Sequence, residues 1–409
     1  MIRTVALAAV VLVGATAVSA QTISQRGFVE ANGVGFPQPA PNDTTQLVGD
    51  VLVREEVFFR PARWIQLAAG VDLRADSHDR VEDRWQLDFD DRGVVRPRAG
   101  VRRLSASLSA GAFSLEVGKQ FIRWGRADLL NPTDRFAPHD FLDVVNPELL
   151  AVNAVRPSVQ IGDETFEAVW VPHLTPSRSP LFDQRWTVVT PEAEGLRIID
   201  GGAVYPAGSQ HGLRWSHAAS RVEASLSYFD GYHHLPAFSV RQPSPDAVEL
   251  TRNYPELRSY GGDIAVPAGL LTVKGELTYF TSPHATTDEY VLYVVQVERQ
   301  ARGWLLIGGY AGEAVTQSRG TLSFSPDRGL ARSIIVRTVR ATDPARTILV
   351  ELVAHQNGDG AYVKGEYSRV IARHWRLTMN GVGIAGEAHD YLGQYNRNSH
   401  GSIALRFSY

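Results

Sequence analysis

The sequence contains no cysteine, and its charge is nearly balanced. Its 409 residues include 41 Lys and Arg and 44 Asp and Glu, a formal net charge of −3. Without cysteine, the chain has no disulfide, no thiolate nucleophile and no cysteine-based metal site. The balanced charge gives no broad basic surface, so we expect no nucleic-acid partner.

A long hydrophobic run is also missing. The apolar stretch Val5–Val18 follows Arg3 and is shorter than the roughly 20 residues of a membrane-spanning helix. The small residues Val18, Ser19 and Ala20 then match a signal-peptidase site. We predict a signal peptide over 1–20 and an exported mature chain over 21–409; the alternative is a retained membrane anchor.

Hydrophobic residues are nevertheless frequent, at 44%, and they are spread through the chain in alternation with polar ones. The apolar face of these segments carries Leu, Val and aromatic residues, and the other face repeatedly carries full charges. A soluble β-sandwich also alternates, but charges on one face suit a water-filled interior with lipid outside. The clearest segments are Trp64–Arg74, Ala112–Trp124, Arg221–Asp230, Leu270–Thr281, Ala345–His355 and Arg373–Gly383.

Short turns and mostly longer connections alternate along the chain. Gly162–Glu164 is typical of the short turns, and Ala75–Arg98 and Thr175–Gln210 are typical of the long ones. Transmembrane barrels have short periplasmic turns and longer outer loops. The pattern predicts an all-β fold, a transmembrane antiparallel up-and-down β-barrel of about 18 strands with both termini in the periplasm. Merging one hairpin would give 16 strands.

The C-terminal segment ends in an aromatic residue. Its alternation resembles the terminal strand by which the outer-membrane assembly machinery recognises its substrates, although a soluble sheet could also end in an amphipathic strand. We therefore expect the protein in the outer membrane, in contact with lipid and lipopolysaccharide, with the assembly machinery as a partner through this strand. The alternating apolar residues are Ile403, Leu405, Phe407 and Tyr409.

One acidic residue departs from the pattern. Glu55 shares the apolar face of its strand with Val53 and Val57, where a carboxylate facing lipid is unfavourable. A β-bulge could shift the register there, or a loop or a neighbouring subunit could cover the face. A homo-trimer would hide Glu55 in its interface.

The most distinctive stretch begins on the segment Ala112–Trp124. There we expect Ile122 to face the lumen with Glu116, Gln120 and Trp124, and Phe121 to face lipid with Leu115. After Trp124, the sequence predicts a long connection, Gly125–Asn153. Its Asn131-Pro132 and Asn146-Pro147 pairs predict short helical turns.

A pattern of spaced residues runs through this region: Gly118, Gln120, Ile122, Trp124-Gly125 and Asp128, followed by Asn131-Pro132 and Asp134. This pattern resembles a group of bacterial outer-membrane barrels that are porin-like and distantly similar to alginate-export-type channels. The resemblance covers Gly118 to about Asp140. It implies a channel whose loop folds inward, and it implies neither a substrate nor catalytic residues.

We predict that the 125–153 loop narrows the lumen of a porin-like channel for small hydrophilic solutes. Charges of both signs at a narrow point select solutes by size and electrostatics. In the alternative, Arg126–Asp128 and Asp134–Arg135 are local ion pairs in an ordinary surface loop, or inward charges plug the barrel. The predicted lining residues are Glu116, Gln120, Trp124, Arg126, Asp128, Asp134, Arg135, His139 and Asp140.

A surface enzyme of the lipase or protease type is the remaining alternative. His233-His234, His139-Asp140 and His389-Asp390 lie in predicted outer loops, where separate loops could assemble a site. No G-x-S-x-G nucleophile motif occurs, and the G-x-G-x-x-G letters of Gly381–Gly386 lie in a predicted strand without a following helix. We therefore predict no catalytic residues, cofactor or metal.

Overall fold

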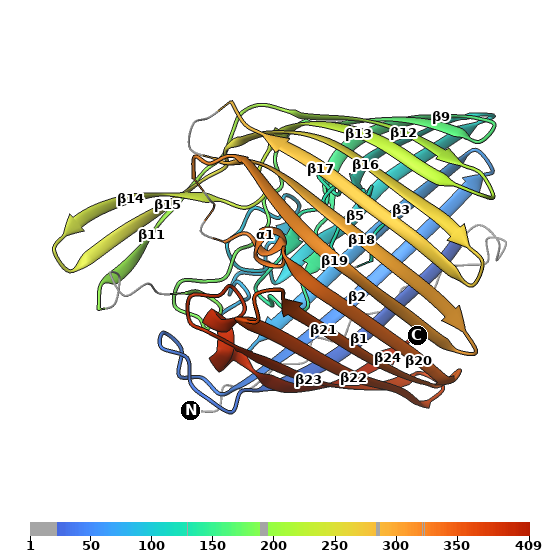
Figure 1. Cartoon of the computed structure of the whole chain (residues 1–409). Helices are drawn as coiled ribbons and strands as arrows, with labels where there is room; N and C mark the ends of the chain where they lie inside the picture. The colour runs from blue at the N-terminus through green and yellow to red at the C-terminus, as the bar shows by residue number, and fades with distance from the viewer. Residues whose placement is uncertain (1–22, 129, 189–194, 284–286, 321, 323) are drawn as a thin grey trace.

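Eighteen long antiparallel strands close into one barrel in the computed structural model, which describes residues 23–128, 130–188, 195–283, 287–320, 322 and 324–409 (Figure 1). Each strand pairs with the next along the chain, and the last pairs back onto the first, from Phe28 opposite Ser408 to Gly35 opposite Gly401. The predicted fold is confirmed. The strands are β1 (Ile23–Gly35), β2 (Leu47–Ala62), β3 (Ile65–Asp76), β5 (Ala99–Ala110), β6 (Phe113–Gln120), β9 (Val152–Ile161), β10 (Glu164–Val171), β12 (Gln210–Ala218), β13 (Glu223–Tyr232), β16 (Glu256–Ala268), β17 (Leu271–Thr281), β18 (Glu289–Ala301), β19 (Trp304–Gln317), β20 (Ser333–Asp343), β21 (Arg346–His355), β22 (Gly360–Ala372), β23 (Trp375–Gly386) and β24 (His400–Ser408).

Smaller elements lie in the long loops. β4 (Leu87–Asp88) pairs in parallel with β5, and β7 (His139–Asp140) pairs with β8 (Glu148–Leu149). β11 (Arg197–Val204), β14 (Ala237–Ser244) and β15 (Ala247–Asn253) form a separate sheet that projects beyond the barrel (Figure 1). Among the described residues, the helical elements are α1 (Pro326–Gly329) and the 3-10 helix η2 (Gly393–Asn398).

The helical turns expected in the 125–153 loop do not form. Its described residues contain turns at 132–133, 135–136 and 141–142 and no helix. Tertiary contacts satisfy the local backbone there in place of helical hydrogen bonds, as shown below. Across the described chain, no helix is long and apolar enough to cross a membrane.

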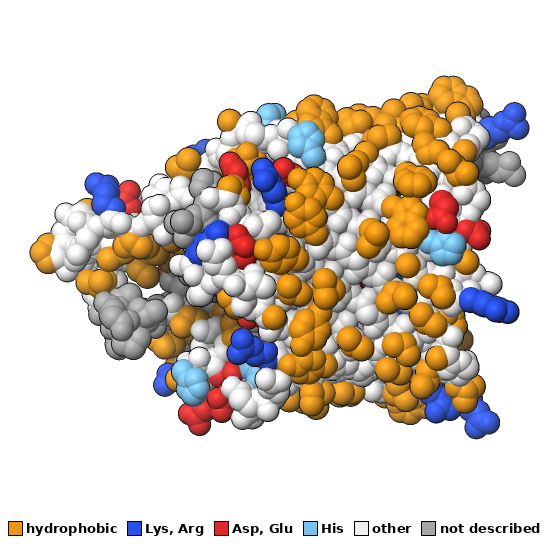
Figure 2. All heavy atoms as spheres, turned by 45° about the horizontal axis from the view of Figure 1, so that its top comes forward, with side chains coloured by type: hydrophobic (Ala, Val, Ile, Leu, Met, Phe, Trp, Pro, Cys, Tyr) orange, Lys and Arg blue, Asp and Glu red, His pale blue; other side chains and the backbone are white. Residues whose placement is uncertain are grey.

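The two faces of the barrel wall differ as the alternation predicts. On β17, Leu271, Val273 and Leu277 are exposed, whereas Glu276 and Thr278 are buried on the opposite face. Hydrophobic side chains spread over the outer wall in Figure 2, and charged side chains gather towards its two edges. An apolar outer band between polar edges is what a bilayer requires of a barrel.

The strand register around Glu55 is regular, so the bulge considered for this position is absent. Glu55 lies opposite Gly27 on β1 and Val71 on β3. The shift between Gly70 and Val71 belongs to the pairing of β3 with β5 and does not involve β2. The Glu55 carboxylate lies over Gly27, which has no side chain, and beside the Tyr409 ring. The chain's own C-terminal aromatic residue therefore covers this acid on the outer face.

Candidate functional site

Strand β6 ends at Gln120, four residues earlier than the alternation suggested. Gly118 has a φ of +115°, and a Cβ there would collide with the backbone of Leu104. This conformation favours glycine and interrupts the alternation of side chains. Lys119 is consequently buried, and its ammonium group lies 2.6 Å from the Asp91 carboxylate.

Phe121 does not face lipid, which corrects the prediction for this residue. The guanidinium groups of Arg102 and Arg103 lie 4.8 Å and 5.2 Å from the centre of its ring. Consecutive side chains of a regular strand point to opposite faces. Arg102 and Arg103 both reach Phe121 because β5 carries one extra residue opposite β3, between Val101 and Arg103. The chain has therefore left the barrel wall at Phe121, where it turns inward.

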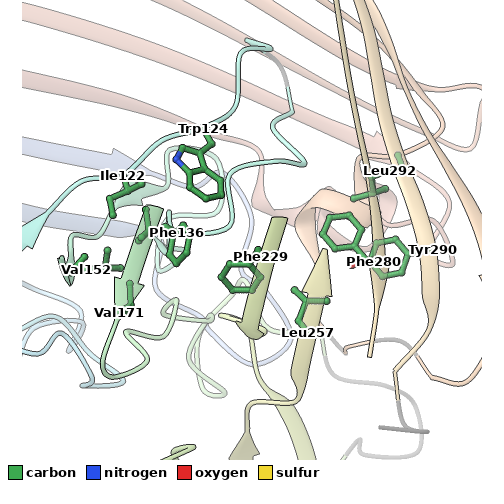
Figure 3. Close-up of a cluster of buried hydrophobic side chains, with 13 residues drawn as sticks. Ile122, Trp124, Phe136, Val152, Val171, Phe229, Leu257, Phe280, Tyr290 and Leu292 are labelled. Atoms are coloured by element: carbon green, nitrogen blue, oxygen red, sulfur yellow. The ribbon is translucent and has the colours of Figure 1, made fainter. Parts of the chain in front are cut away.

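Aromatic packing holds the start of the 125–153 loop against the inner wall (Figure 3). Trp124 is 2% exposed, and its ring meets that of Phe136 edge-on, with centroids 5.1 Å apart. Both rings lie over Gly212 of β12, where any Cβ would collide with them. Phe136 in turn meets Phe229 of β13 at 5.1 Å. The loop thus crosses the interior from β6 towards β13.

A single carboxylate on β17 binds the middle of the loop. Glu276 accepts the backbone N–H groups of Arg126, Ala127 and Thr133, with N to O distances of 3.0, 3.0 and 2.9 Å. It also accepts the Thr133 hydroxyl at 2.8 Å. Glu276, Ala127 and Thr133 are all buried. The sequence places Glu276 on the inner face of its strand, but no pattern in it indicates this partner.

Arg126 and Asp128 bind the barrel wall and do not pair with each other. Arg126 donates to Asp263 of β16 at 2.5 Å and pairs with Glu223 of β13. Asp128 accepts Lys274 of β17 at 2.7 Å. The alternative of a local Arg126–Asp128 pair is therefore wrong, because both partners are on strands far along the chain.

Asp134 and Arg135 also have separate partners. Asp134 accepts the backbone N–H groups of Trp124 and Gly125, and it lies 3.3 Å from the Arg123 guanidinium. Arg135 lies 3.5 Å from Asp327 of another outer loop. Asp134 therefore closes the start of the loop onto itself. Arg135 links the loop to the segment between β19 and β20.

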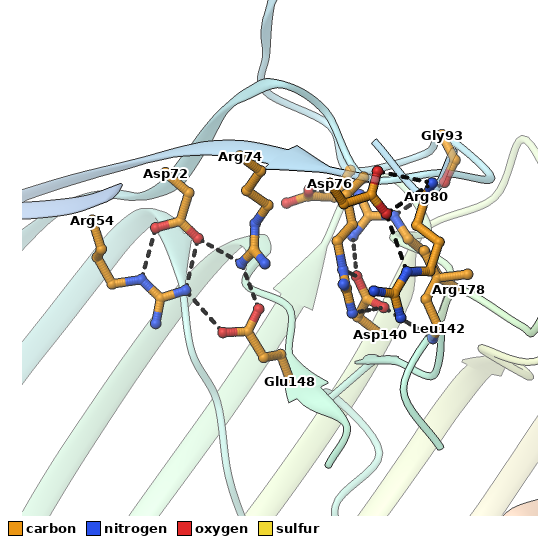
Figure 4. Close-up of polar contacts among 12 residues, drawn as sticks. Arg54, Asp72, Arg74, Asp76, Arg80, Gly93, Asp140, Leu142, Glu148 and Arg178 are labelled. Atoms are coloured by element: carbon orange, nitrogen blue, oxygen red, sulfur yellow. Dashed lines mark hydrogen bonds and ion pairs between the residues drawn. The ribbon is translucent and has the colours of Figure 1, made fainter. Parts of the chain in front are cut away.

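The far end of the loop joins a network of buried ion pairs (Figure 4). The Asp140 carboxylate accepts hydrogen bonds from the guanidinium groups of Arg96, at 2.8 Å, and Arg178, at 3.1 Å. Burial alone would raise the pKa of Asp140, but these arginines hold it well below its usual range. Asp140 therefore ties together the 125–153 loop and the loops that contain Arg96 and Arg178.

Glu148 forms the second centre of this network. Its carboxylate accepts a hydrogen bond from Arg54 of β2 at 2.9 Å and also pairs with Arg74 of β3. The Asp72 carboxylate binds the same two arginines. Burial opposes the charged form, yet Arg74 and Arg54 lower the pKa of Glu148 to about 2. The end of the loop is thus bound to β2 and β3.

The remaining predicted residues belong to the wall or to the protein interior. Glu116 pairs with Arg156 of β9 at 3.2 Å. Gln120 is fully buried and donates to the Ala154 carbonyl at 3.1 Å. His139 is largely enclosed, and burial lowers its pKa.

A cavity of about 330 Å³ lies against the loop. Of the residues predicted to line the narrow point, only Asp134, Arg135 and His139 line this cavity. Sequence reasoning missed the other residues that line the cavity. Alternation placed Arg123 on the lipid face with Phe121, and most of the rest come from separate loops and strands. The missed residues include Arg123, His233, His234, Asp327, Arg337, Glu351, Tyr290 and Tyr391.

The histidine and aspartate residues that are adjacent in the sequence of the outer loops have separate partners. Asp140 pairs with the arginines named above and not with His139. His234 has its two ring nitrogens 2.8 Å and 2.7 Å from the carbonyl oxygens of Thr175 and Arg135. Asp390 pairs with His355, and His389 lies 3.4 Å from Asp359.

A closed barrel of 18 strands with an apolar outer face, a charged interior and one loop bound inside it is the architecture of an outer-membrane β-barrel of the porin type. No protein-family model matches the sequence, and comparison with curated proteins gives no significant relative.

Solved structures of similar architecture include a protein described as a porin. OccK9 (OpdG) of Pseudomonas aeruginosa is 12% identical, with 95% of this chain and 97% of that chain covered and a TM-score of 0.55. OccAB4 of Acinetobacter baumannii is 10% identical, with 95% and 98% covered and a TM-score of 0.54. A BenF-like porin from Pseudomonas fluorescens Pf-5 is 12% identical, with 95% and 97% covered and a TM-score of 0.52. The porin fold implied by the sequence resemblance is confirmed.

Proposed function

We propose that this barrel is an outer-membrane channel for small hydrophilic solutes and that the 125–153 loop is its constriction. The observation that carries the proposal is the set of four hydrogen bonds between Glu276 and the loop. A loop fixed across the interior reduces the cross-section through which water and solutes pass. A wall built from charges of both signs then discriminates by size and charge distribution.

The proposed selection needs no covalent step. Arg126 and Asp128 are occupied by wall partners, so their role is to position the loop. Arg123, by contrast, has a side chain that is 54% exposed and lies beside the cavity. We therefore assign solute contact to Arg123, Arg135 and His139 and positioning to Arg126 and Asp128.

Planar-bilayer recordings of the purified mature protein test this function. Replacing residues 126–134 with a Gly-Ser linker of equal length should increase the open-channel conductance and weaken discrimination between solutes. The matched control replaces residues 242–246, in the hairpin outside the barrel, and should leave conductance unchanged. A silent wild-type protein would refute the channel, and an unaltered conductance in the 126–134 variant would refute the constriction.

We also propose that Tyr409 serves recognition by the assembly machinery and that the barrel can associate as a homo-trimer. Glu55 no longer requires the trimer, because Tyr409 covers it. Crosslinking in mild detergent tests the association. A monomer at all protein concentrations would argue against it without affecting the channel.

A further inference from the structure

The pairing of β9 with β10 is interrupted at two positions without a change of register. Paired residues run from Glu164 opposite Ile161 to Glu167 opposite Ser158, and pairing resumes only at Trp170 opposite Val155. Pro157 lies in the gap and has no N–H group to donate to a neighbouring strand. Two adjoining hollows of about 550 and 380 Å³ lie over this gap, and both are lined by Pro157, Ala168, Leu213 and Tyr228.

Together the two hollows form an apolar groove on the membrane-facing side. Phe166, Trp170, Leu213 and Leu226 along it are 44–61% exposed, which is the exposure of the outer face. The groove follows β10 past the small side chain of Ala168. Lipid tails are as apolar as these side chains, so the bilayer gives no hydrophobic driving force here, but an unfilled hollow would lose dispersion contacts.

One end of the groove is polar. The Glu164 carboxylate accepts the indole N–H of Trp215 at 2.7 Å and lies 2.7 Å from Nδ1 of His217. Arg221 is exposed in the adjoining β12–β13 turn. These groups stand at the short-turn edge of the wall, and Ala168 lies four residues further along β10, roughly 13 Å at strand spacing.

We propose that this groove is a binding site for one phospholipid with a zwitterionic phosphoethanolamine headgroup. The Glu164 carboxylate binds the ammonium group, and His217 and Arg221 bind the phosphate. One acyl chain fills the groove over Ala168 and Pro157, where the pairing of β9 with β10 is interrupted. Charge complementarity favours this occupant, because the site presents a carboxylate beside two groups that can carry positive charge, as a zwitterion requires.

Native mass spectrometry of the full mature barrel in mild detergent tests the site, with phosphatidylethanolamine and phosphatidylglycerol as the added lipids. Wild-type protein should bind one phosphatidylethanolamine in preference to phosphatidylglycerol. Glu164→Gln should weaken that binding about tenfold, the effect of losing one charge-assisted contact. Ala168→Leu fills the groove and should reduce binding similarly. The matched control, Ala69→Leu, changes an exposed outer-face alanine on β3 and should bind as wild type does.

Several outcomes would overturn the site. Equal binding of both lipids, or unchanged binding in both variants, would refute it. An oligomer that is lost in Ala168→Leu would assign the groove to a second copy of the chain. The slower gel mobility of unheated barrels checks that each variant is folded. The channel measurements are independent, so conductance can persist whichever result is obtained.

Discussion

Glu276 offers the sharpest test of how the 125–153 loop is held. Glu276→Ala removes the acceptor of three backbone N–H groups and of the Thr133 hydroxyl. The barrel itself should remain closed, because the hydrogen bonds between its strands use the backbone. We therefore expect a folded barrel in which the loop detaches from β17 much more often than in the wild type.

The expected size of this effect follows from burial. Each buried N–H group left without an acceptor costs about 1–3 kcal/mol. Ala127 and Thr133 are 6% and 2% exposed, whereas Arg126 is partly exposed and can be hydrated. A total of about 2–6 kcal/mol then raises the detached population by roughly one and a half to four orders of magnitude. Glu276→Gln retains one acceptor oxygen, so its detached population should lie between those of the wild type and Glu276→Ala.

Limited trypsin digestion of the reconstituted barrel measures this population, because arginine sites in the loop become accessible when it detaches. Single-channel recordings should show larger and noisier openings in Glu276→Ala. The control Glu298→Gln alters a carboxylate that pairs with Lys274 but does not bind the loop. If Glu276→Ala resists trypsin and conducts as the wild type does, the anchoring argument is wrong.

Three further predictions concern the backbone, the ion pairs and pH. Gly118→Ala should destabilise the barrel by about 1–3 kcal/mol in urea unfolding, because its φ of +115° strains a side chain; Gly308→Ala, with open space around it, should change little. Asp140→Asn removes the carboxylate that pairs with Arg96, whereas Arg178 keeps Asp91, and should cost about 3–5 kcal/mol, seen as faster loop proteolysis; an unaltered rate would contradict the network. Burial lowers the pKa of His234 to about 4, below the 6.5 of an unfolded chain, so the loops lose stability as pH falls from about 6.5 to 4. Proteolysis should rise over that window in the wild type and rise less in His234→Gln, and equal profiles would exclude His234 as the cause.

The strands could be predicted because a barrel wall imposes one requirement on every second residue. On β17 the sequence alternates Leu271 and Val273 with Thr272 and Lys274, and the structure exposes the first pair to the outside. The positions of the short turns could be predicted as well. Gly162, for example, takes the left-handed conformation that such turns favour. Alternation fails at Phe121, because it assumes a continuous strand and the strand ends one residue earlier.

The partners of the loop could not be predicted, because they depend on how the barrel closes. Thr133 and Glu276 are separated by 143 positions, and only the curvature of the complete wall brings them together. The sequence indicates that Glu276 faces inward but not which segment will meet it. The same reasoning explains Glu55. Its neighbour Tyr409 is the last residue of the chain and reaches it only because β24 pairs with β1. The closing strand pair therefore supplies the cover of a lipid-facing acid, with no bulge and no subunit interface.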